Sequence, residues 1–400
     1  MKDAIGAQGV KDAIGAQGVN MAPARGRVLV FVVTVDWFFA SHFLARALAA
    51  RAAGWRVVVV AREGPAAARI RALGIELVPV AFERASLDPL AHMRLVWRLS
   101  GLYRALRPDL VHHVAMKPIL LGGLAARLAG VRAVVNAPVG LGFVFSSSGG
   151  LARRLRPLVR AWLRVTLTPP NAVAVFETEA DRYEMLRAGL AAPGRVRVIA
   201  GAGVDGGRFV PSAPPGGRVR VVMAARLLRA KGVELFAEAA GRLRGRAEFW
   251  LAGAPDAGNP DSLRADEVAA LADAQGVRWL GEVADMPGLL AGAHIVCLPS
   301  YYGEGLPKIL LEAMACGRAV VASDIAGCRA ALGDEAGLLV APRDAEALCA
   351  ALARLIEDAP LRARLGQAGR ARVEAAFLDE HICARTLALY DELTVLGEGR

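Results

Sequence analysis

The chain has 400 residues, of which 55% are hydrophobic and 22% are charged. A chain of this length is too long for one hydrophobic core, so two domains are expected, and its composition excludes a largely disordered protein. The formal net charge of +11 lies in the first half, because residues 21–215 carry 26 Lys and Arg against 11 Asp and Glu, whereas residues 216–400 carry 21 against 25.

The basic first half indicates an anionic partner: a phosphate-bearing substrate, an acidic membrane face or nucleic acid. An arginine-biased genome would produce the same excess without any partner. The first 20 residues contain KDAIGAQGV twice, and we expect residues 1–20 to be a disordered, duplicated leader or the result of a misplaced start. From Val28 to Ala45 the chain is nearly apolar, but Asp36 and His42 interrupt it, which favours a strand and a helix over a membrane span.

Apolar runs typical of buried strands alternate with helical patterns in residues 21–205, which are expected to form an N-terminal domain. Strands are expected at 27–35, 55–61, 75–80, 109–114 and 132–139, with helices at 40–54, 66–74, 87–106 and 118–129. This alternation predicts an α/β domain with a parallel, doubly wound, Rossmann-like sheet.

Polar residues follow two of these strands at their carboxyl ends, where such sheets bind ligands. Residues 36–42, DWFFASH, end in His42, and His113 and Lys117 occupy the corresponding end of another strand. These three residues are candidates for substrate contact, and the alternative is a structural histidine.

An arginine-rich segment covers residues 149–170 and has five arginines and no acid. Its apolar residues recur at helical spacing, so it predicts an amphipathic helix. Such a helix either lies in a membrane interface or is an ordinary helix with a basic outer face. The expected membrane contacts are Arg153, Arg154, Arg156, Arg160 and Trp162.

Residues 206–217 are rich in proline and glycine and are expected to be a linker. The alternation then restarts, which predicts a C-terminal Rossmann-like domain at 218–376 and a C-terminal helix at 377–400 that packs back toward the N-terminal domain. Strands are expected at 218–226, 247–253, 277–281, 294–300, 319–323 and 337–340, with helices at 232–243, 262–275, 284–292, 307–316, 344–357 and a last helical stretch at about 361–393.

The pattern G-x-G-x-x-G occurs at Gly201, Gly203 and Gly206, directly after a strand that the run RVRVIA at 195–200 predicts. A dinucleotide site of this kind requires a helix next, because the helix N-terminus binds the pyrophosphate. The residues that follow, GRFVPSAPPGG, cannot form a helix. The pattern therefore does not support an oxidoreductase.

Glu304 and Glu312 lie eight residues apart in the stretch SYYGEGLPKILLEAMACGRAVVAS, beside much apolar surface. Pro307 suits the first turn of a helix and Gly317 its C-terminal cap, so the first glutamate precedes the helix and the second lies inside it. At about 1.5 Å per residue they are on the order of 10 Å apart on one side. Between them the helix N-terminus can bind a diphosphate, and the alternative is one capping and one solvated glutamate.

Arg226 ends the predicted strand 218–226 and Lys231 follows it, in the stretch AARLLRAKG. Two cations at a strand end suit a leaving group that gains negative charge, and the alternative is a solvated charged turn. The sequence has no D-x-D triplet and no CxxC pair, two common metal-binding patterns. We therefore expect no metal and no cofactor.

The stretch EGLPKILLEAMACGRAVVAS, with its Glu-x7-Glu arrangement, resembles the retaining glycosyltransferases of family 4, which have the GT-B fold. AARLLRAKG is similar to the segment in which that family has an Arg and a Lys for the donor diphosphate. GAGVD and VRWLGEVADMPGLLAGAHIVCLPS complete a resemblance that extends from Val28 to about Leu393. It is close to the subgroup that extends lipid-linked glycans in capsule, O-antigen and protein-glycosylation pathways. Two features differ: Glu177 and Thr178 stand where the subgroup often has Gln and Asn, and AVVNAPVGLGF lacks a histidine that many members present to the donor sugar.

The resemblance implies a role for each motif residue. The implied catalytic residues are Glu304, Arg226 and Lys231, and the implied donor-binding residues are Glu312, Gly305, Leu306 and Gly203. Contacts to the acceptor or the sugar are expected from Gly140, Gly142, His42, His113 and Lys117.

The resemblance implies a retaining, metal-independent glycosyltransferase of GT-B fold, with two Rossmann-like domains facing a cleft. Its donor would be a nucleotide sugar, UDP-linked, carrying a hexose or N-acetylhexosamine, and its acceptor a glycan on a polyprenyl diphosphate held by the N-terminal domain. The leaving diphosphate would help to deprotonate the acceptor hydroxyl. We expect a cytoplasmic protein, peripheral on the anionic inner face of the plasma membrane, with no nucleic acid partner.

Three alternatives stay open. The same chemistry on a soluble acceptor needs no membrane. A GT-B sugar-nucleotide epimerase would need acid and base residues in the cleft. A non-catalytic binding protein could tolerate the loss of Glu304 or Lys231, and both are present.

Overall fold

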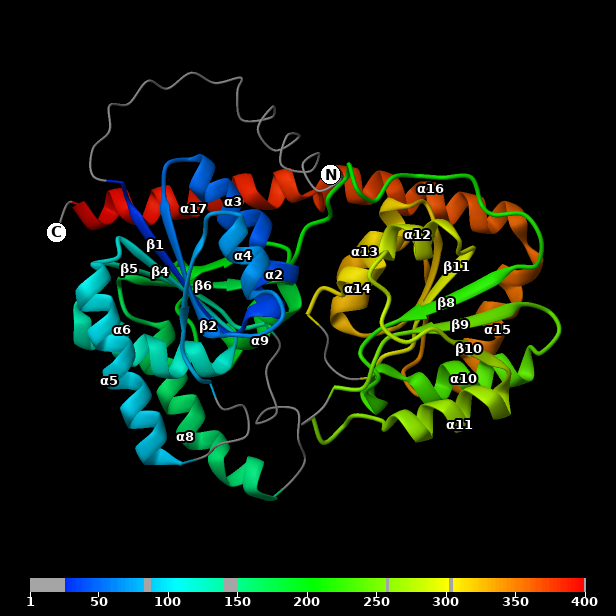
Figure 1. Ribbon diagram of the computed structural model, residues 1–400, viewed down its shortest axis with the longest axis horizontal. Helices are drawn as coiled ribbons and strands as arrows, with labels where there is room; N and C mark the ends of the chain where they lie inside the picture. The colour runs from blue at the N-terminus through cyan, green and yellow to red at the C-terminus, as the bar shows by residue number, and fades with distance from the viewer. Residues whose placement is uncertain (1–25, 83–87, 140–149, 257–258, 302–304, 399–400) are drawn as a thin grey trace. The chain divides into compact units, whose positions relative to one another are not determined.

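The computed structural model describes residues 26–82, 88–139, 150–256, 259–301 and 305–398, with side chains except at 150–156, 158 and 396–398 (Figure 1). The chain divides into two compact units. Unit 1 comprises Met1–Ala202 and Asp379–Arg400, and unit 2 comprises Gly203–Leu378. Both units are built on a parallel sheet with helices, as the alternating pattern predicts.

Unit 1 has, within its described residues, a seven-stranded sheet in the order β3-β2-β1-β4-β5-β6-β7. Its strands are β1 (Val28–Val35), β2 (Arg56–Arg62), β3 (Glu76–Pro79), β4 (Leu110–Val114), β5 (Ala133–Ala137), β6 (Ala172–Phe176) and β7 (Val196–Val198). Every residue of β4, β5 and β6 is buried, because helices cover both faces of a parallel sheet.

The helices of unit 1 form two groups. Helix α5 packs on α6, which continues from the π-helix η1, and α8 also packs on η1, whereas α17 packs on α3. Their bounds are α2 (Asp36–His42), α3 (Leu44–Ala52), α4 (Ala67–Ala72), α5 (Pro89–Leu106), η1 (Pro118–Gly122), α6 (Gly123–Ala129), α8 (Gly150–Leu167), α9 (Glu179–Arg187), the 3-10 turn η2 (Pro193–Arg195) and α17 (Asp379–Glu398).

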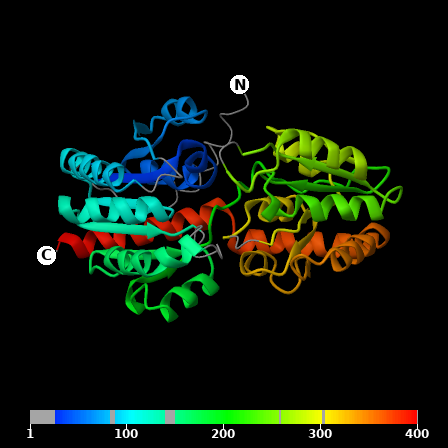
Figure 2. The same ribbon diagram turned by 90° about the horizontal axis from the view of Figure 1, so that it is seen from below.

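The C-terminal helix α17 lies with unit 1 in both views, where it is drawn in red (Figures 1 and 2). Arg46 of α3 is buried and donates to Thr386 Oγ1 of α17 at 3.3 Å. It also donates to the carbonyl oxygens of Ala200, at 3.0 Å, and Gly201. The chain passes from unit 1 to unit 2 after Ala202 and returns at Asp379. The Arg46 guanidinium therefore binds both the segment just before the first crossing and the helix that follows the second.

Unit 2 has, within its described residues, a six-stranded parallel sheet in the order β10-β9-β8-β11-β12-β13. Its strands are β8 (Arg220–Ala224), β9 (Glu248–Ala252), β10 (Val277–Trp279), β11 (Ile295–Leu298), β12 (Ala319–Ser323) and β13 (Leu338–Val340). Its helices are the 3-10 turn η3 (Arg229–Lys231), α10 (Val233–Arg242), α11 (Ala265–Gln275), α12 (Met286–Ala291), α13 (Lys308–Ala315), α14 (Ala326–Leu332), α15 (Ala345–Glu357) and α16 (Ala359–Ala376).

The predicted linker, residues 206–217, belongs to unit 2, where most of its residues are exposed and two of its carbonyl groups are bound. Phe209 is buried and its carbonyl oxygen accepts from Arg370 Nη1 at 3.1 Å. The carbonyl oxygen of Ser212 accepts from Nη2 of the buried Arg318 at 2.8 Å. Proline and glycine break the helix and strand patterns here, but they leave carbonyl groups that distant arginines bind.

The predicted last helical stretch is two helices, α16 and α17. The break falls at Phe377 and Leu378, which pair with Val204 instead of continuing the helix. The Val204 N–H donates to the carbonyl oxygen of Phe377 at 2.9 Å. This tertiary pairing stops a helical pattern that is continuous in the sequence.

Candidate active site

In the sheet of unit 2, the chain adds β9 and β10 on one side of β8 and then β11, β12 and β13 on the other. The strand order therefore reverses between the neighbours β8 and β11. In doubly wound sheets, ligands bind outside the carboxyl ends of the strands at such a switch point. Two segments leave this edge, residues 225–232 after β8 and, after β11, residues 299–301, with 305–307 described before α13. The first loop carries Arg226 and Lys231, and the second leads into α13.

The two loops are hydrogen-bonded to each other. The carbonyl oxygen of Ala230 accepts from the N–H of Tyr301 at 3.0 Å and from Ser300 Oγ at 3.1 Å. Gly232 has a φ of 79°, and a Cβ at this position would collide with the carbonyl oxygen of Pro299. Only glycine fits here, and the close approach keeps the loop after β8 beside the loop after β11.

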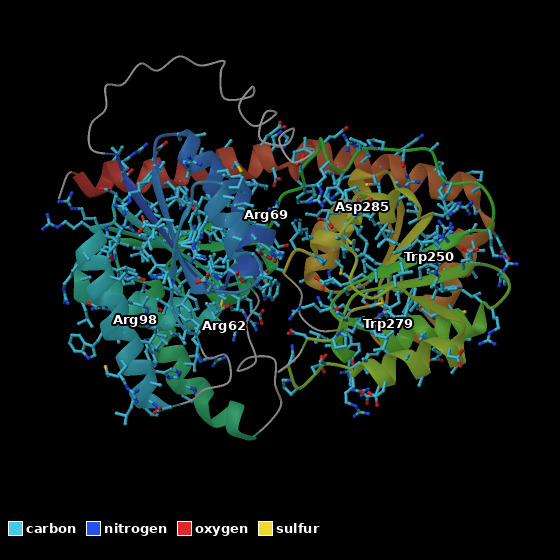
Figure 3. All side chains as sticks on the ribbon, viewed as in Figure 1. Arg62, Arg69, Arg98, Trp250, Trp279 and Asp285 are labelled. Atoms are coloured by element: carbon cyan, nitrogen blue, oxygen red, sulfur yellow. The ribbon has the colours of Figure 1, made fainter. Side chains whose placement is uncertain are left out.

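A third loop, residues 253–264 after β9, supports the loop after β8. Asp261 accepts from the Ala230 N–H through its carboxylate at 3.0 Å and from the Arg229 N–H through its carbonyl oxygen at 2.9 Å. Trp279 of β10, labelled in Figure 3, donates from Nε1 to the carbonyl oxygen of Gly253 at 2.9 Å. Sequence reasoning did not select Asp261, because its partners are backbone groups about 30 residues away.

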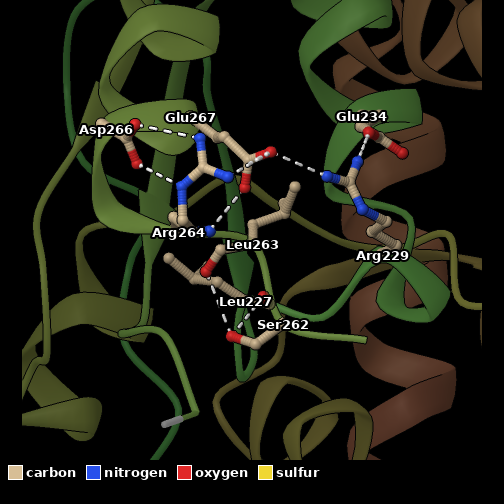
Figure 4. A network of polar contacts seen from close by, with 8 residues as sticks. All are labelled: Leu227, Arg229, Glu234, Ser262, Leu263, Arg264, Asp266 and Glu267. Atoms are coloured by element: carbon tan, nitrogen blue, oxygen red, sulfur yellow. Dashed lines mark hydrogen bonds and ion pairs between the residues drawn. The ribbon is translucent and has the colours of Figure 1, made fainter. Parts of the chain in front are cut away.

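Charged side chains join these loops to helices α10 and α11 (Figure 4). Arg229 forms ion pairs with Glu234 and, at 3.0 Å, with Glu267. Glu267 also accepts from the backbone N–H of Arg264 at 2.8 Å, which closes the first turn of α11. Exposed ion pairs of this kind add little stability.

Arg226 is held by an acidic residue that the sequence did not single out. Its Nη1 lies 2.7 Å from Asp256 Oδ2, and the side chain of Asp256 is 15% exposed against 46% for Arg226. The Asp256 N–H donates to Ser262 Oγ at 2.9 Å, which ties the aspartate to its own loop. A guanidinium is planar and has five N–H donors, so a pair made through one nitrogen sets the direction of the others.

Helix α13 starts one residue later than predicted, with Pro307 at its N-cap, and Gly317 follows it with a φ of 70°. Glu312 in this helix is buried, at 8% exposed. Lys308 Nζ lies 3.4 Å from its carboxylate, one helical turn earlier. Burial among apolar neighbours disfavours the charged form of a carboxylate, and the ammonium group of Lys308 offsets part of that cost.

Several predicted positions lie outside the described residues. Glu304, Gly140 and Gly142 are among them, so the distance from Glu304 to the second glutamate stays a prediction. Gly305 and the buried Leu306 directly precede α13 in the switch-point loop. Gly203 is buried at the start of unit 2, and its donor contact stays a prediction.

The switch point of unit 1 lies between β1 and β4. Asp36, directly after β1, is buried and accepts from the Gly64 N–H at 2.8 Å, so it fixes the loop after β2. His42 ends α2 and stacks on Phe38, with ring centroids 4.2 Å apart. Lys117 is half-buried just after β4 and directly before η1. The acceptor contacts of His42 and Lys117 stay predictions.

His113 does not reach the surface, in contrast to the predicted acceptor contact. It is 0% exposed, and both ring nitrogens have partners: Nδ1 lies 2.9 Å from Asn136 Oδ1 and Nε2 lies 3.1 Å from the Tyr103 hydroxyl. Burial lowers the pKa of His113 to about 4. Its place in the interior of unit 1 makes it a structural residue.

The predicted membrane helix, α8, is described in part. The side chains of Arg153, Arg154 and Arg156 lie outside the described residues, and Arg160 is exposed. Trp162 is half-buried and packs against the hydrophobic core of unit 1, and its membrane contact stays a prediction. Among the described residues, no helix combines the length and the apolar character that crossing a bilayer requires.

Two Rossmann-like units in one chain are the architecture of the GT-B glycosyltransferases. Comparison with known families agrees: residues 28–168 match the family described as "Glycosyl transferase 4-like" and residues 218–358 match "Glycosyl transferases group 1". The chain belongs to the glycosyltransferase family that these two descriptions cover.

One relative is similar over nearly the whole chain. The N,N'-diacetylbacillosaminyl-diphospho-undecaprenol alpha-1,3-N-acetylgalactosaminyltransferase of Campylobacter jejuni is 30% identical over 352 residues, which are 84% of this chain and 91% of the relative. Among solved structures, a sucrose-phosphate synthase from Thermosynechococcus elongatus has a TM-score of 0.75 at 22% identity, covering 92% of this chain and 100% of that one. HepE of Anabaena in complex with UDP and glucose has a TM-score of 0.75 at 18% identity with the same coverage. These structures establish the GT-B fold.

Proposed function

We propose that the protein is a retaining glycosyltransferase that moves a hexose or N-acetylhexosamine from a UDP-sugar to a glycan on a polyprenyl diphosphate. The observation that carries the proposal is the similarity over 84% of the chain to a transferase whose name specifies an undecaprenyl-diphosphate acceptor and an N-acetylgalactosamine. The neighbour crystallised with UDP and glucose is the reason to test UDP-sugars first.

In the proposed reaction, the bond between the anomeric carbon and the diphosphate oxygen breaks. A bond forms on the same face between that carbon and the oxygen of the acceptor hydroxyl, whose proton passes to the leaving diphosphate. Arg226 and Lys231 neutralise the charge that grows on the diphosphate, without a metal ion. Glu304 and Glu312 accept hydrogen bonds from hydroxyl groups of the sugar and the ribose.

The test is transfer to a short-chain prenyl diphosphate glycan, with UDP-, GDP- and ADP-sugars in turn. NMR of the new anomeric centre decides between retention and inversion, and turnover in EDTA decides whether a metal is needed. Arg226→Ala and Lys231→Ala are each expected to lower turnover on the order of a hundredfold or more. Arg264→Ala, which removes exposed ion pairs in α11, is the control and keeps turnover.

Other outcomes would replace the proposal. Transfer only to a water-soluble glycan would identify a soluble-acceptor enzyme. Conversion of the UDP-sugar without any acceptor would identify an epimerase. Because a polyprenyl chain stays in the bilayer, we also propose that the protein works at the cytoplasmic face of the membrane, bound peripherally.

A further inference from the structure

Helix α5 has apolar residues on its outer side. Leu90, Met93 and Trp97 are 70%, 51% and 57% exposed. Their spacing of three and four residues places them along one side of the helix. The opposite side of α5 supplies Val96 and Leu99 to the core, so the outer three are not needed to hold the helix on unit 1. Single exposed apolar residues are ordinary, but a row of three is typical of an interaction surface.

Two arginines accompany this row. Arg94 and Arg98 are exposed on the same side, and Arg98, labelled in Figure 3, donates to the carbonyl oxygen of Pro79 at 3.0 Å. We call Leu90, Met93, Arg94, Trp97 and Arg98 the α5 face. The nearest acid in the sequence, Asp88, is the N-cap of the helix and accepts from the Leu90 N–H at 2.9 Å.

The positive charge continues across the neighbouring helices. Arg104 of α5 donates to the carbonyl oxygen of Leu128 at the end of α6 at 2.7 Å, and Arg127 of α6 donates to that of Val165 in α8 at 3.2 Å. These contacts place α5, α6 and α8 side by side, as Figure 1 shows. None of the three helices has an acidic residue in its sequence.

The charge imbalance over this region is large. Residues 89–176 contain 12 Lys and Arg and one acid, Asp109, whose carboxylate accepts from the Val28 N–H at 2.7 Å. A partner must therefore be anionic over a wide area and must also accept apolar side chains. A bilayer with anionic lipids meets both requirements, because its phosphates lie above hydrocarbon.

We propose that the α5 face is a membrane-binding surface for anionic lipids. Tryptophan is favoured at the level of the lipid headgroups, and Leu90 and Met93 enter the boundary beside Trp97. The stems of Arg94 and Arg98 lie along the apolar residues while their guanidinium groups bind lipid phosphates. The proposal deepens the proposed function, since a lipid-linked acceptor gives the enzyme a reason to bind a bilayer, but the binding is measured without acceptor or donor.

The experiment is flotation of the full-length protein with vesicles of phosphatidylglycerol and phosphatidylcholine, compared with phosphatidylcholine alone. Wild-type protein is expected to float with the anionic vesicles at low salt and to dissociate near 1 M salt, where the Debye length falls to about 3 Å. Replacing Leu90, Met93 and Trp97 together by Ser is expected to lower the bound fraction at least tenfold. The matched control replaces two apolar residues outside the face, Tyr183→Ser and Val395→Ser, each 68% exposed, and keeps binding.

Three results would overturn the inference. One is wild-type protein that does not float, and another is a triple variant that floats like the wild type. The third is a wild-type protein that is a dimer in light scattering and a triple variant that is a monomer, which would make the α5 face an interface between two copies.

Turnover on a short, detergent-soluble acceptor separates the two proposals, because the triple variant keeps this turnover if the α5 face only binds lipid. Flotation without any transferase activity would remove the proposed function and keep the surface.

Discussion

At the level of single residues, the pair formed by Arg226 and Asp256 offers the sharpest test of the site. The half-buried carboxylate holds one nitrogen of the guanidinium at 2.7 Å and so orients the remaining donors. We expect Asp256→Asn to raise the donor KM and to lower kcat/KM about tenfold, since misplaced cations stabilise the diphosphate less well. In an Arg226→Ala background the same change should have almost no effect, because both residues act through one guanidinium.

Wild type, the two single variants and the double variant form a double-mutant cycle, and Glu267→Gln is its matched control. It removes an ion pair of Arg229 in the same loop system, at 3.0 Å, without touching Arg226. Its effect on stability is expected to be small, because the pair is exposed, with the donor KM unchanged. Steady-state kinetics of the four proteins of the cycle measure the coupling. Additive losses in the double variant would mean that Asp256 only supports its own loop.

Glu312 poses a second question at this scale, because its carboxylate has Lys308 as a neighbour at 3.4 Å. If the glutamate binds the ribose, Glu312→Gln raises the donor KM while the protein stays folded. Lys308→Met removes the neighbouring cation and leaves the glutamate. Donor kinetics and urea denaturation of both variants decide the matter. Equal losses of stability with unchanged KM in both would make the pair purely structural.

At the level of the elements, Gly232 joins the loops after β8 and β11. A Cβ would meet the Pro299 carbonyl oxygen, and the φ of 79° is unfavourable for any other residue. We expect Gly232→Ala to destabilise the protein by about 2–4 kcal/mol, from the backbone strain and from the collision together. Donor affinity should also fall, because Lys231 is the preceding residue. Urea denaturation and UDP titration measure the two effects.

Gly245 is the control that distinguishes the backbone strain at Gly232 from the collision with the Pro299 carbonyl oxygen. It has a φ of 83°, but a Cβ there would meet no atom within 4 Å. Gly245→Ala should therefore cost only the backbone term, about 1–2 kcal/mol, and leave UDP binding intact. A Gly232→Ala protein no less stable than this control would show that the loops after β8 and β11 can separate freely.

Helices α5 and α8 show what a helical pattern leaves open. Both are rich in arginine, lack acids and carry a tryptophan. Trp162 of α8 packs on the core of unit 1, whereas Trp97 of α5 is 57% exposed. The sequence predicts a helix in each place, but the side that faces the protein depends on how the helix is rotated on the sheet.

At the level of the whole molecule, two buried histidines make stability depend on pH. Burial lowers the pKa of His113 to about 4, and burial with the nearby Arg46 lowers the pKa of His112 as well. In the unfolded chain the pKa of a histidine is about 6.5. Below that pH the unfolded chain takes up protons that the folded protein does not, so stability present near neutral pH is lost as the pH falls toward 4. For His113 the loss is on the order of 3 kcal/mol.

Thermal unfolding between pH 7 and pH 5 measures this effect before most carboxylates titrate. His113→Gln should be less stable at pH 7, because the bonds to Asn136 and Tyr103 change, but its melting temperature should fall less with pH. Parallel curves for wild type and variant would mean that His113 takes up its proton in the folded state as well.

The sequence by itself determined the alternation of strands and helices, because side-chain periodicity and turn residues act over a few neighbouring positions. It also placed Arg226, Lys231 and Glu312 on their elements and showed the family resemblance. Strand β6 and helices α9 and α14 were not among the predicted elements, although NAVAVF is a short apolar run of the expected kind.

Only the tertiary structure decided which residues are buried and which partners they have. His113 belongs to the interior of unit 1, and the proline-rich segment at 206–217 is part of unit 2, with Phe209 buried. Asp256 meets Arg226 from 30 positions away, and Arg46 meets Thr386 from 340. Such contacts bring together segments that are distant in the chain, and no local pattern encodes them. The packing of the sheets and the loops at their edges therefore decides which charged residues form the site.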